Sequence, residues 1–268
     1  MNEPEIVVLP NEELAAAETA KRIATALARA VEVRGRADWV TTGGSALVAR
    51  YRHLAAPPLV DAIPWARVHV WWTDDRYVPR DHPLSNVKPF DDVLLGLADA
   101  EEGTAGGGYA GVPLPVENIH PFRTGEAIGR RAGAAWCAAA LADELRSAGL
   151  PEQEGWPIFD LIGLGMGPDG HIFSVFPGSA AFDSTELALA IPAPTHIEPH
   201  VERVTLNPAV VGVARQAIVV VHGEEKAPVL AEVFGPERDP RRWPAQLARR
   251  EGVLWILDEA AASGLPGR

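Results

Sequence analysis

Cysteine is almost absent from this sequence of 268 residues, which contains only Cys137. An internal disulfide is therefore excluded, and the fold must be stabilised without a disulfide framework. Cys137 lies in the alanine-rich stretch RRAGAAWCAAALADEL. Its helical, apolar neighbours predict a small buried side chain rather than a reactive thiol.

Basic residues are also in the minority. The chain has 24 Lys and Arg against 36 Asp and Glu, which gives a formal net charge of −12. Such a surface repels nucleic acid and anionic membranes, so we expect neither as a partner. A local cationic pocket is still compatible with this composition.

Long apolar runs are missing as well. No stretch approaches the roughly 18 apolar residues that a membrane-spanning helix needs. The first residues, MNEPEIVVLP, show no basic region followed by a long apolar one. From these features we expect a soluble, cytoplasmic protein.

Short apolar runs alternate with helical patterns along the whole chain. Most of the runs are uniformly apolar, as expected when helices cover both faces of a parallel sheet. The predicted strands are EIVVL (5–9), ADWVTT (37–42), RVHVWWT (67–73), FDLIGLG (159–165), LALAIPA (187–193), AIVVVHG (217–223) and GVLWILD (252–258).

The helical patterns between these strands complete repeated strand, loop and helix units. The first helix follows Asn11, a capping residue, and ends near Gly35. Further helices are predicted at 45–55, 86–98, 125–149 and 224–234. This order predicts an α/β fold, namely an open, doubly wound, mostly parallel, Rossmann-like sheet in a single domain over 1–268. The glycine-rich segment 100–118 is predicted to be a surface loop.

Ligands of such sheets bind outside the carboxyl ends of the strands. Gly43, Gly44 and Ser45 follow the strand at 37–42 and precede a helix. Free backbone N–H groups and the positive helix end would bind an anion there, with the Ser45 hydroxyl as a further ligand. A simple tight turn with a capping serine is an equally good interpretation of these three residues alone.

The segment TDDRYVPRDHPLSN follows the strand at 67–73 and is predicted to be a loop. Asp74 lies in it, and Arg76 could form a forked bond to a phosphate or carboxylate. A solvated turn with an internal ion pair explains the same residues, because exposed ion pairs are ordinary.

The segment DLIGLGMGPDGHIF carries glycines at 163, 165, 167 and 170, followed by His171. We expect Asp169 to cap a short helix and His171 to lie in its first turn, where the positive helix end disfavours an imidazolium. A neutral imidazole facing the crevice would act as a general base. The alternative is a histidine that only forms hydrogen bonds on a helix surface.

Two further cations, Arg203 and Lys226, lie beside predicted strand ends. Either could instead be an ordinary surface charge. No metal site is predicted, because the histidines at 171, 196, 200 and 222 lack a metal-ligand spacing.

Five motifs occur in one order and together span most of the chain: GGS (43–45), TDDRYVP (73–79) with SN (85–86), GLGMGPDGH (163–171), RVTLN (203–207) and HGEEK (222–226). In that order they resemble the 6-phosphogluconolactonase family. The resemblance implies a fold shared with glucosamine-6-phosphate deaminases and hydrolysis of 6-phospho-D-glucono-1,5-lactone. Two positions differ from the family's pattern, with Asp75 in place of glutamate and Asn207 in place of threonine.

The resemblance also implies roles for individual residues. The phosphorylated substrate would be bound by Gly43, Gly44, Ser45, Arg76, Gly167, Arg203 and Lys226. His171 would be the base, with Asp74 or Asp169 orienting it, and N–H groups of the glycine turn would stabilise the oxyanion. No cofactor or metal is implied, and we expect a monomer or weak homodimer. The alternatives are an amino-sugar phosphate deaminase or isomerase and a non-catalytic sugar-phosphate sensor.

Overall fold

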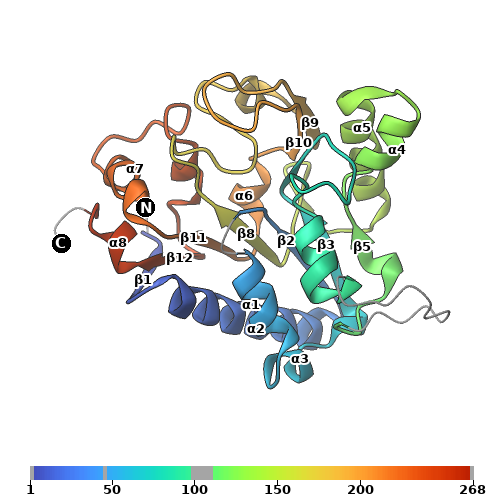
Figure 1. The fold of residues 1–268 in the computed structure, drawn as a ribbon, viewed down its shortest axis with the longest axis horizontal. Coiled ribbons are helices and arrows are strands. Elements are labelled where there is room, and N and C mark those ends of the chain that lie inside the picture. The colour runs from blue at the N-terminus through green and yellow to red at the C-terminus, as the bar shows by residue number, and fades with distance from the viewer. Residues whose placement is uncertain (1–2, 45–46, 98–110, 266–268) are drawn as a thin grey trace.

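A seven-stranded parallel sheet runs through the middle of the computed structural model, which describes residues 3–44, 47–97 and 111–265 (Figure 1). Each pair of neighbouring strands is parallel, so the predicted parallel α/β sheet is confirmed. Across the sheet the strands are β1 (Glu5–Leu9), β12 (Val253–Asp258), β11 (Ala217–Val221), β8 (Leu161–Gly165), β2 (Ala37–Thr41), β3 (Val68–Trp72) and β5 (Ile119–His120).

The order of the strands reverses direction between β2 and β8. From β2 the chain continues outward to β3 and β5, whereas from β8 it continues the other way to β11 and β12. In open α/β sheets a crevice forms at such a reversal, outside the carboxyl ends of the strands. The glycines that follow β2 and β8 therefore meet at one place.

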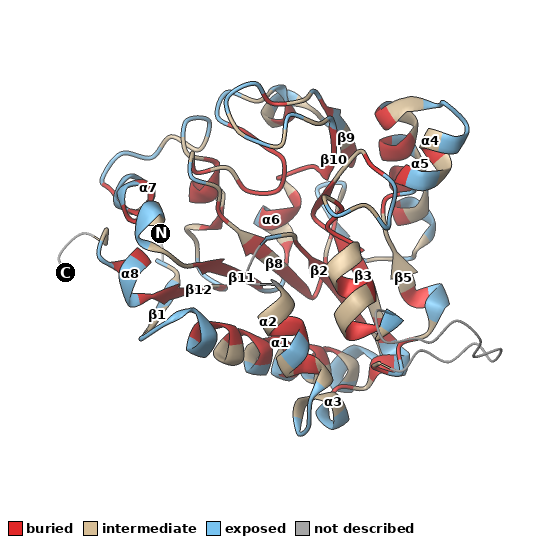
Figure 2. Cartoon of the chain, viewed as in Figure 1, coloured by how far each residue is buried: buried red, intermediate tan, exposed pale blue. Residues whose placement is uncertain are grey.

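Helix α1 (Glu12–Arg34) packs along one face of the sheet and is bounded as predicted. Asn11 accepts a hydrogen bond from the Leu14 N–H at 2.9 Å, and Gly35 ends the helix with φ 75°. Helices α2 (Leu47–Ala55) and α3 (Leu59–Ala62) lie beside α1 on the same face (Figure 1). The five central strands of the sheet are mostly buried, whereas the edge strands β1 and β5 are partly exposed (Figure 2).

A second, smaller sheet was not predicted. It contains β4 (Asp74–Arg76), β10 (Arg203–Leu206) and β9 (Ala188–Ile191), all antiparallel. The segment after β3 is thus a strand rather than the predicted loop, and 188–191 does not join the main sheet. The pairing places Arg76 directly opposite Arg203.

Two predicted helices are shorter than expected. The helix at 125–149 is divided into α4 (Thr124–Gly129) and α5 (Gly133–Ser147), because Arg131 and Gly133 have φ of 54° and 82°. The described part of the segment 86–98 contains a π-helical turn, Phe90–Leu94, in place of a long α-helix. Most of the predicted surface loop 100–118 lies outside the described residues. The remaining elements are β6 (Glu152–Gln153), β7 (Trp156–Pro157), α6 (Val210–Val213), α7 (Ala227–Val233) and α8 (Glu259–Ala262).

Cys137 is buried in α5, as predicted. Burial raises the pKa of its thiol to about 12, which leaves it protonated at neutral pH. None of the helices in the described parts of the chain has the length and apolar character to cross a bilayer.

A chain of hydrogen bonds fastens the edge strand β5. The Glu144 carboxylate accepts from His120 Nδ1 at 2.6 Å, so His120 Nε2 is left to accept from His69 Nδ1 at 3.0 Å. The His120 ring also stacks on Trp71 with centroids 4.0 Å apart. Burial, together with the charge of Arg36, lowers the pKa of His69 to about 4.

This cluster predicts that acid weakens the fold. The unfolded chain binds a proton at His69 with a pKa near 6.5, whereas the folded protein binds it more weakly. The contribution of neutral His69 to the free energy of unfolding is therefore complete above about pH 6.5. It is lost as the pH falls toward 4. In thermal melts at pH 7.5 and pH 5, His69→Gln should lose less stability on acidification than the wild type. An equal loss in both proteins would contradict the assignment.

Asp75 in β4 holds the segment that follows it. This fully buried carboxylate accepts hydrogen bonds from the backbone N–H groups of Arg76 (2.8 Å) and Asn86 (2.7 Å) and from the Ser85 hydroxyl (3.0 Å). Burial raises the pKa of Asp75 to about 7, although these donors oppose the shift. The Asp75 carboxylate thus stabilises residues 76–86 through hydrogen bonds in the protein interior. This role explains why an acidic residue lies next to Arg76.

Replacing Asp75 with alanine should therefore destabilise the protein. Three donors, two of them buried, would lose their acceptor, and at roughly 1 kcal/mol each the free energy of unfolding should fall by about 3 kcal/mol. Asp92→Ala is the matched control, since Asp92 forms only a partly exposed ion pair with Lys88 and its loss should cost less than about 1 kcal/mol. Urea unfolding measures both. Similar midpoints for the two variants would refute this role for Asp75.

Candidate active site

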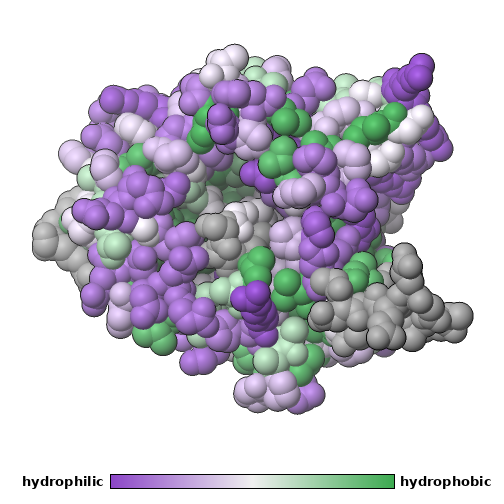
Figure 3. All heavy atoms as spheres, in the orientation of Figure 1, coloured by the Kyte–Doolittle hydropathy of each residue, from purple (hydrophilic) through white to green (hydrophobic). Residues whose placement is uncertain are grey.

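A cavity of about 170 Å³ opens at the carboxyl ends of β2 and β8, where the strand order reverses. The space-filling view shows this face hollowed near its centre and surrounded mainly by hydrophilic residues (Figure 3). The cavity is lined by Thr42, Gly43, Gly44, Asp74, Arg76, Asn86, Gly165, Met166, Gly167, His171, Phe173 and Arg203. Seven of these are predicted site residues, and they come from four separate motifs.

The turn after β2 approaches its neighbours closely. A Cβ atom at Gly43 would overlap the Asn86 side-chain amide, so only glycine fits there without displacing Asn86. Gly44 adopts φ 121°, a conformation that other residues rarely adopt. Ser45, the predicted third member of this anion site, lies outside the described residues.

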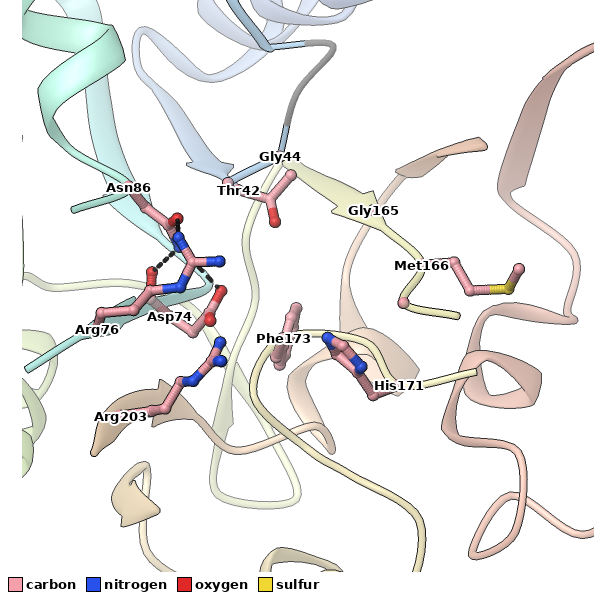
Figure 4. A pocket seen from close by; sticks show the side chains of 12 residues that line it. Thr42, Gly44, Asp74, Arg76, Asn86, Gly165, Met166, His171, Phe173 and Arg203 are labelled. Atoms are coloured by element: carbon pink, nitrogen blue, oxygen red, sulfur yellow. Dashed lines mark hydrogen bonds between the residues drawn. The ribbon is translucent and has the colours of Figure 1, made fainter. Parts of the chain in front are cut away.

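Arg76 and Arg203 lie on adjacent strands of the small sheet, and Figure 4 shows both guanidinium groups on the side of Asp74. Arg76 Nη1 donates to the Leu84 carbonyl and to Asn86 Oδ1, each at 2.9 Å. Arg203 Nη2 donates to the Pro199 carbonyl at 3.2 Å. Burial lowers the pKa of Arg203, and the charge of Asp74 partly offsets this.

Asp74 is engaged by residues other than the histidine. Its carboxylate accepts from Ser174 Oγ at 2.5 Å, from Thr73 Oγ1 at 2.9 Å and from Asn86 Nδ2 at 3.4 Å. Through these bonds Asp74 joins β4 to the turn after β8 and places a negative charge between the two arginines. These hydrogen bonds thus place Asp74 on the arginine side of the cavity.

His171 reaches the cavity from the turn after β8, in contact with Asp169. The predicted short helix is wrong, because residues 167–176 form tight turns in which the Gly167 N–H donates to the His171 carbonyl at 2.9 Å. A positive helix end is therefore absent from this described segment. His171 Nδ1 instead lies 2.5 Å from Asp169 Oδ1, and His196 Nε2 lies 2.9 Å from Asp169 Oδ2.

The Asp169 carboxylate sets the hydrogen position on the His171 ring. Burial raises the pKa of Asp169, but hydrogen bonds from His171 and His196 outweigh it and hold that pKa well below its usual range. An ionised carboxylate can only accept, so in neutral His171 the hydrogen is on Nδ1 and Nε2 carries the free lone pair. The pair thus presents a proton acceptor from the cavity wall.

Gly167 makes room for this ring. A Cβ at position 167 would overlap the His171 imidazole, so any other residue would displace the ring from Asp169. The N–H groups of Gly167 and Gly170 are used inside the turn, by the carbonyls of His171 and Gly167. These two donors therefore do not serve the oxyanion, contrary to one expectation from the resemblance.

Lys226 lies in a neighbouring cavity of about 170 Å³ that shares Gly43, Gly44, Gly165 and Met166 with the first. The predicted cations thus border two adjoining spaces with a common floor. Burial lowers the pKa of Lys226, with Glu225 and Asp169 acting against the shift. The charge of Asp169 acts on both Arg203 and Lys226.

Sequence reasoning missed several residues of the site. The site contains three further positioning residues: Asn86 accepts from Arg76, Ser174 donates to Asp74, and His196 contacts Asp169. Asn86 alone had a signal, since it belongs to the SN pair that accompanies the TDDRYVP motif. Within residues 3–44, 47–97 and 111–265 there is no group of three His, Cys, Asp or Glu residues that could hold a metal ion.

Solved structures share this fold over the whole chain. A 6-phosphogluconolactonase from Trypanosoma cruzi superimposes with a TM-score of 0.82 at 24% identity, covering 98% of this chain and 97% of the other. A monomeric glucosamine-6-phosphate deaminase superimposes with a TM-score of 0.74 at 14% identity, covering 97% and 99%. Likeness at these identities shows the fold alone, and both activities occur on it.

Relatives with at least 30% identity show which family the chain belongs to. A 6-phosphogluconolactonase of Mycobacterium tuberculosis is 33% identical over 97% of this chain and 98% of its own length. One from Synechocystis is 30% identical over 98% of each chain. Residues 10–255 match the family described as glucosamine-6-phosphate isomerases/6-phosphogluconolactonase, and the chain belongs to that family.

Proposed function

We propose that this protein is a 6-phosphogluconolactonase, an ester hydrolase that converts 6-phospho-D-glucono-1,5-lactone to 6-phosphogluconate. The observation that carries the proposal is the Asp169–His171 pair, whose bond at Nδ1 leaves Nε2 as a base beside a cavity lined by two arginines. The names of the relatives with 30% identity or more support the same reaction.

The phosphorylated substrate is bound by Gly43, Gly44, Ser45, Arg76, Gly167, Arg203 and Lys226. A phosphate dianion loses strong hydration on binding, so charged side chains and backbone donors must replace the water. In a chain with net charge −12, clustered cations at one edge of the sheet provide this locally.

In the reaction, His171 Nε2 removes a proton from a water molecule as the water oxygen attacks C1 of the lactone. A C–O bond forms, and the carbonyl oxygen becomes negatively charged. The bond from C1 to the ring oxygen then breaks, and the proton on Nε2 passes to that oxygen. Asp169 keeps the ring oriented and stabilises the imidazolium between these two transfers.

The negative carbonyl oxygen requires donors other than the N–H groups of Gly167 and Gly170. Arg203 is suited to the task, because its positively charged side chain lines the same cavity as His171. In other hydrolases such a donor contributes roughly 3 to 4 kcal/mol to the transition state.

Replacing the base tests the mechanism. His171→Ala should lower kcat for lactone opening by a factor of about 10² to 10⁴, as for loss of a general base, while 6-phosphogluconate still binds. His53→Ala is the matched control, since His53 pairs with Glu13 on the outside of α2. In the assay, the lactone is generated by oxidation of glucose 6-phosphate, and its rate of decay is measured with and without each protein. Unchanged turnover in His171→Ala would exclude this residue as the base, and a wild type no faster than spontaneous opening would favour a sugar-phosphate sensor.

The rival activity is deamination of an amino-sugar phosphate on the same fold. Those relatives typically carry DEY where this chain has DDRY, so Arg76 favours the lactonase. Incubation with glucosamine 6-phosphate should release no ammonia above background, whereas the lactone should be consumed rapidly. Ammonia release at a rate comparable with lactone opening would overturn the proposed function.

A further inference from the structure

Arg50 in α2 is a buried cation whose role the proposed reaction does not explain. The residue is 5% exposed, and its Nε has no hydrogen-bond acceptor in the described parts of the chain. The neighbouring Arg52, on the same helix, is exposed. Because a buried donor without a partner is costly, the position of Arg50 calls for an acceptor that the described residues do not supply.

Arg50 shares this feature with the two arginines of the reaction cavity. The buried side-chain donors without a partner in the described residues are Trp39 Nε1 and the Nε atoms of Arg50, Arg76 and Arg203. Buried polar groups in proteins are normally satisfied, so exceptions are significant. All three arginines line cavities that share the floor formed by Gly43, Gly44, Gly165 and Met166.

Arg50 adjoins two spaces, and only one has room for a ligand. A void of about 10 Å³ under the sheet is at the limit for one water molecule. The other is the cavity of about 170 Å³ that also contains Lys226 and lies over Gly43 and Gly44. A partner for the guanidinium must therefore come from the Lys226 side.

The charges around that space favour an anion. Lys226 and Arg50 both line it, against one carboxylate, that of Glu225. Burial lowers the pKa of Arg50 to about 10, and the charge of Glu12 compensates for only part of this. Burial also lowers the pKa of Lys226. Two desolvated cations that face one small cavity would be stabilised by a compact anion with several acceptor oxygens.

We propose that Arg50 is a phosphate-binding residue, and that it and Lys226 hold the 6-phosphate over Gly43 and Gly44 while the lactone ring lies in the His171 cavity. This inference rests on the proposed function and assigns the two cavities to the two ends of one substrate. Arg76 and Arg203 then contact the sugar end. Arg76 is the less suited to phosphate, because its Nη1 already donates to two acceptors.

The assignment makes Arg50 a determinant of specificity. A lactone without phosphate would leave the guanidinium and Lys226 desolvated and unpaired, so the protein should discriminate against it. If Arg50 instead served only to fill space under α2, a side chain of similar length without charge would replace it at no cost to binding.

The test compares Arg50→Met and Arg50→Lys with Arg52→Met, which removes the same charge from an exposed position of the same helix. Binding of inorganic phosphate and of 6-phosphogluconate is measured by calorimetry, which requires no turnover. Arg50→Met should weaken both by about 10- to 100-fold, the effect of losing a charged hydrogen bond. Arg50→Lys should recover part of the loss, and Arg52→Met should bind as the wild type does.

Two further measurements distinguish a role of Arg50 in binding from a role in stabilising the fold. The ligand-free Arg50→Met protein should melt at the same temperature as the wild type or higher, because an unpaired buried charge is gone. Its KM for the lactone should rise by a larger factor than its kcat falls. Wild-type affinity for phosphate in Arg50→Met, or no phosphate binding by the wild type, would overturn the inference. Phosphate binding that depends on Arg50 without lactone opening would refute only the proposed function.

Discussion

The hydrogen bond between Asp169 and His171 Nδ1 is the interaction on which the site depends. It exists because β8 ends at the reversal of strand order and because Gly167 leaves space for the imidazole. The same carboxylate accepts from His196, a residue 27 positions further along the chain. Its negative charge acts on Arg203 in one cavity and on Lys226 in the next. One half-buried acid thus fixes the tautomer of His171 and favours the charged forms of the cations on both sides.

The central sheet and α1 could be predicted because their signals are local. Uniform apolar runs mark strands covered on both faces, and Asn11 and Gly35 mark the ends of a helix within a few residues. The small sheet could not be predicted in this way. Its strand 74–76 is polar and pairs with 203–206, more than a hundred residues away. Such a pairing depends on the whole fold, and the polar letters DDR alone indicate a loop.

Seven of the predicted site residues line one cavity, but the physical reason given for a neutral His171 was wrong. The glycine pattern and His171 do mark the cavity, but the turn holds no helix end that could keep the imidazole neutral. The carboxylate of Asp169 fixes the tautomer instead. The sequence also hides Ser174 and Arg50, because their burial depends on the whole fold. Residue type at one position says little about such burial.

The arginines around the cavities show how an acidic protein can present local positive charge. Charges on the surface are screened over about 8 Å at physiological ionic strength, so the net charge of −12 has little effect inside a cavity. The Nε atoms of Arg50, Arg76 and Arg203 are buried and unsatisfied. This arrangement costs stability in the empty protein, and a bound anion with several acceptor oxygens recovers that cost. In the proposed binding mode, affinity and selectivity for phosphate have the same source, namely guanidinium groups that the fold buries without an acceptor at Nε.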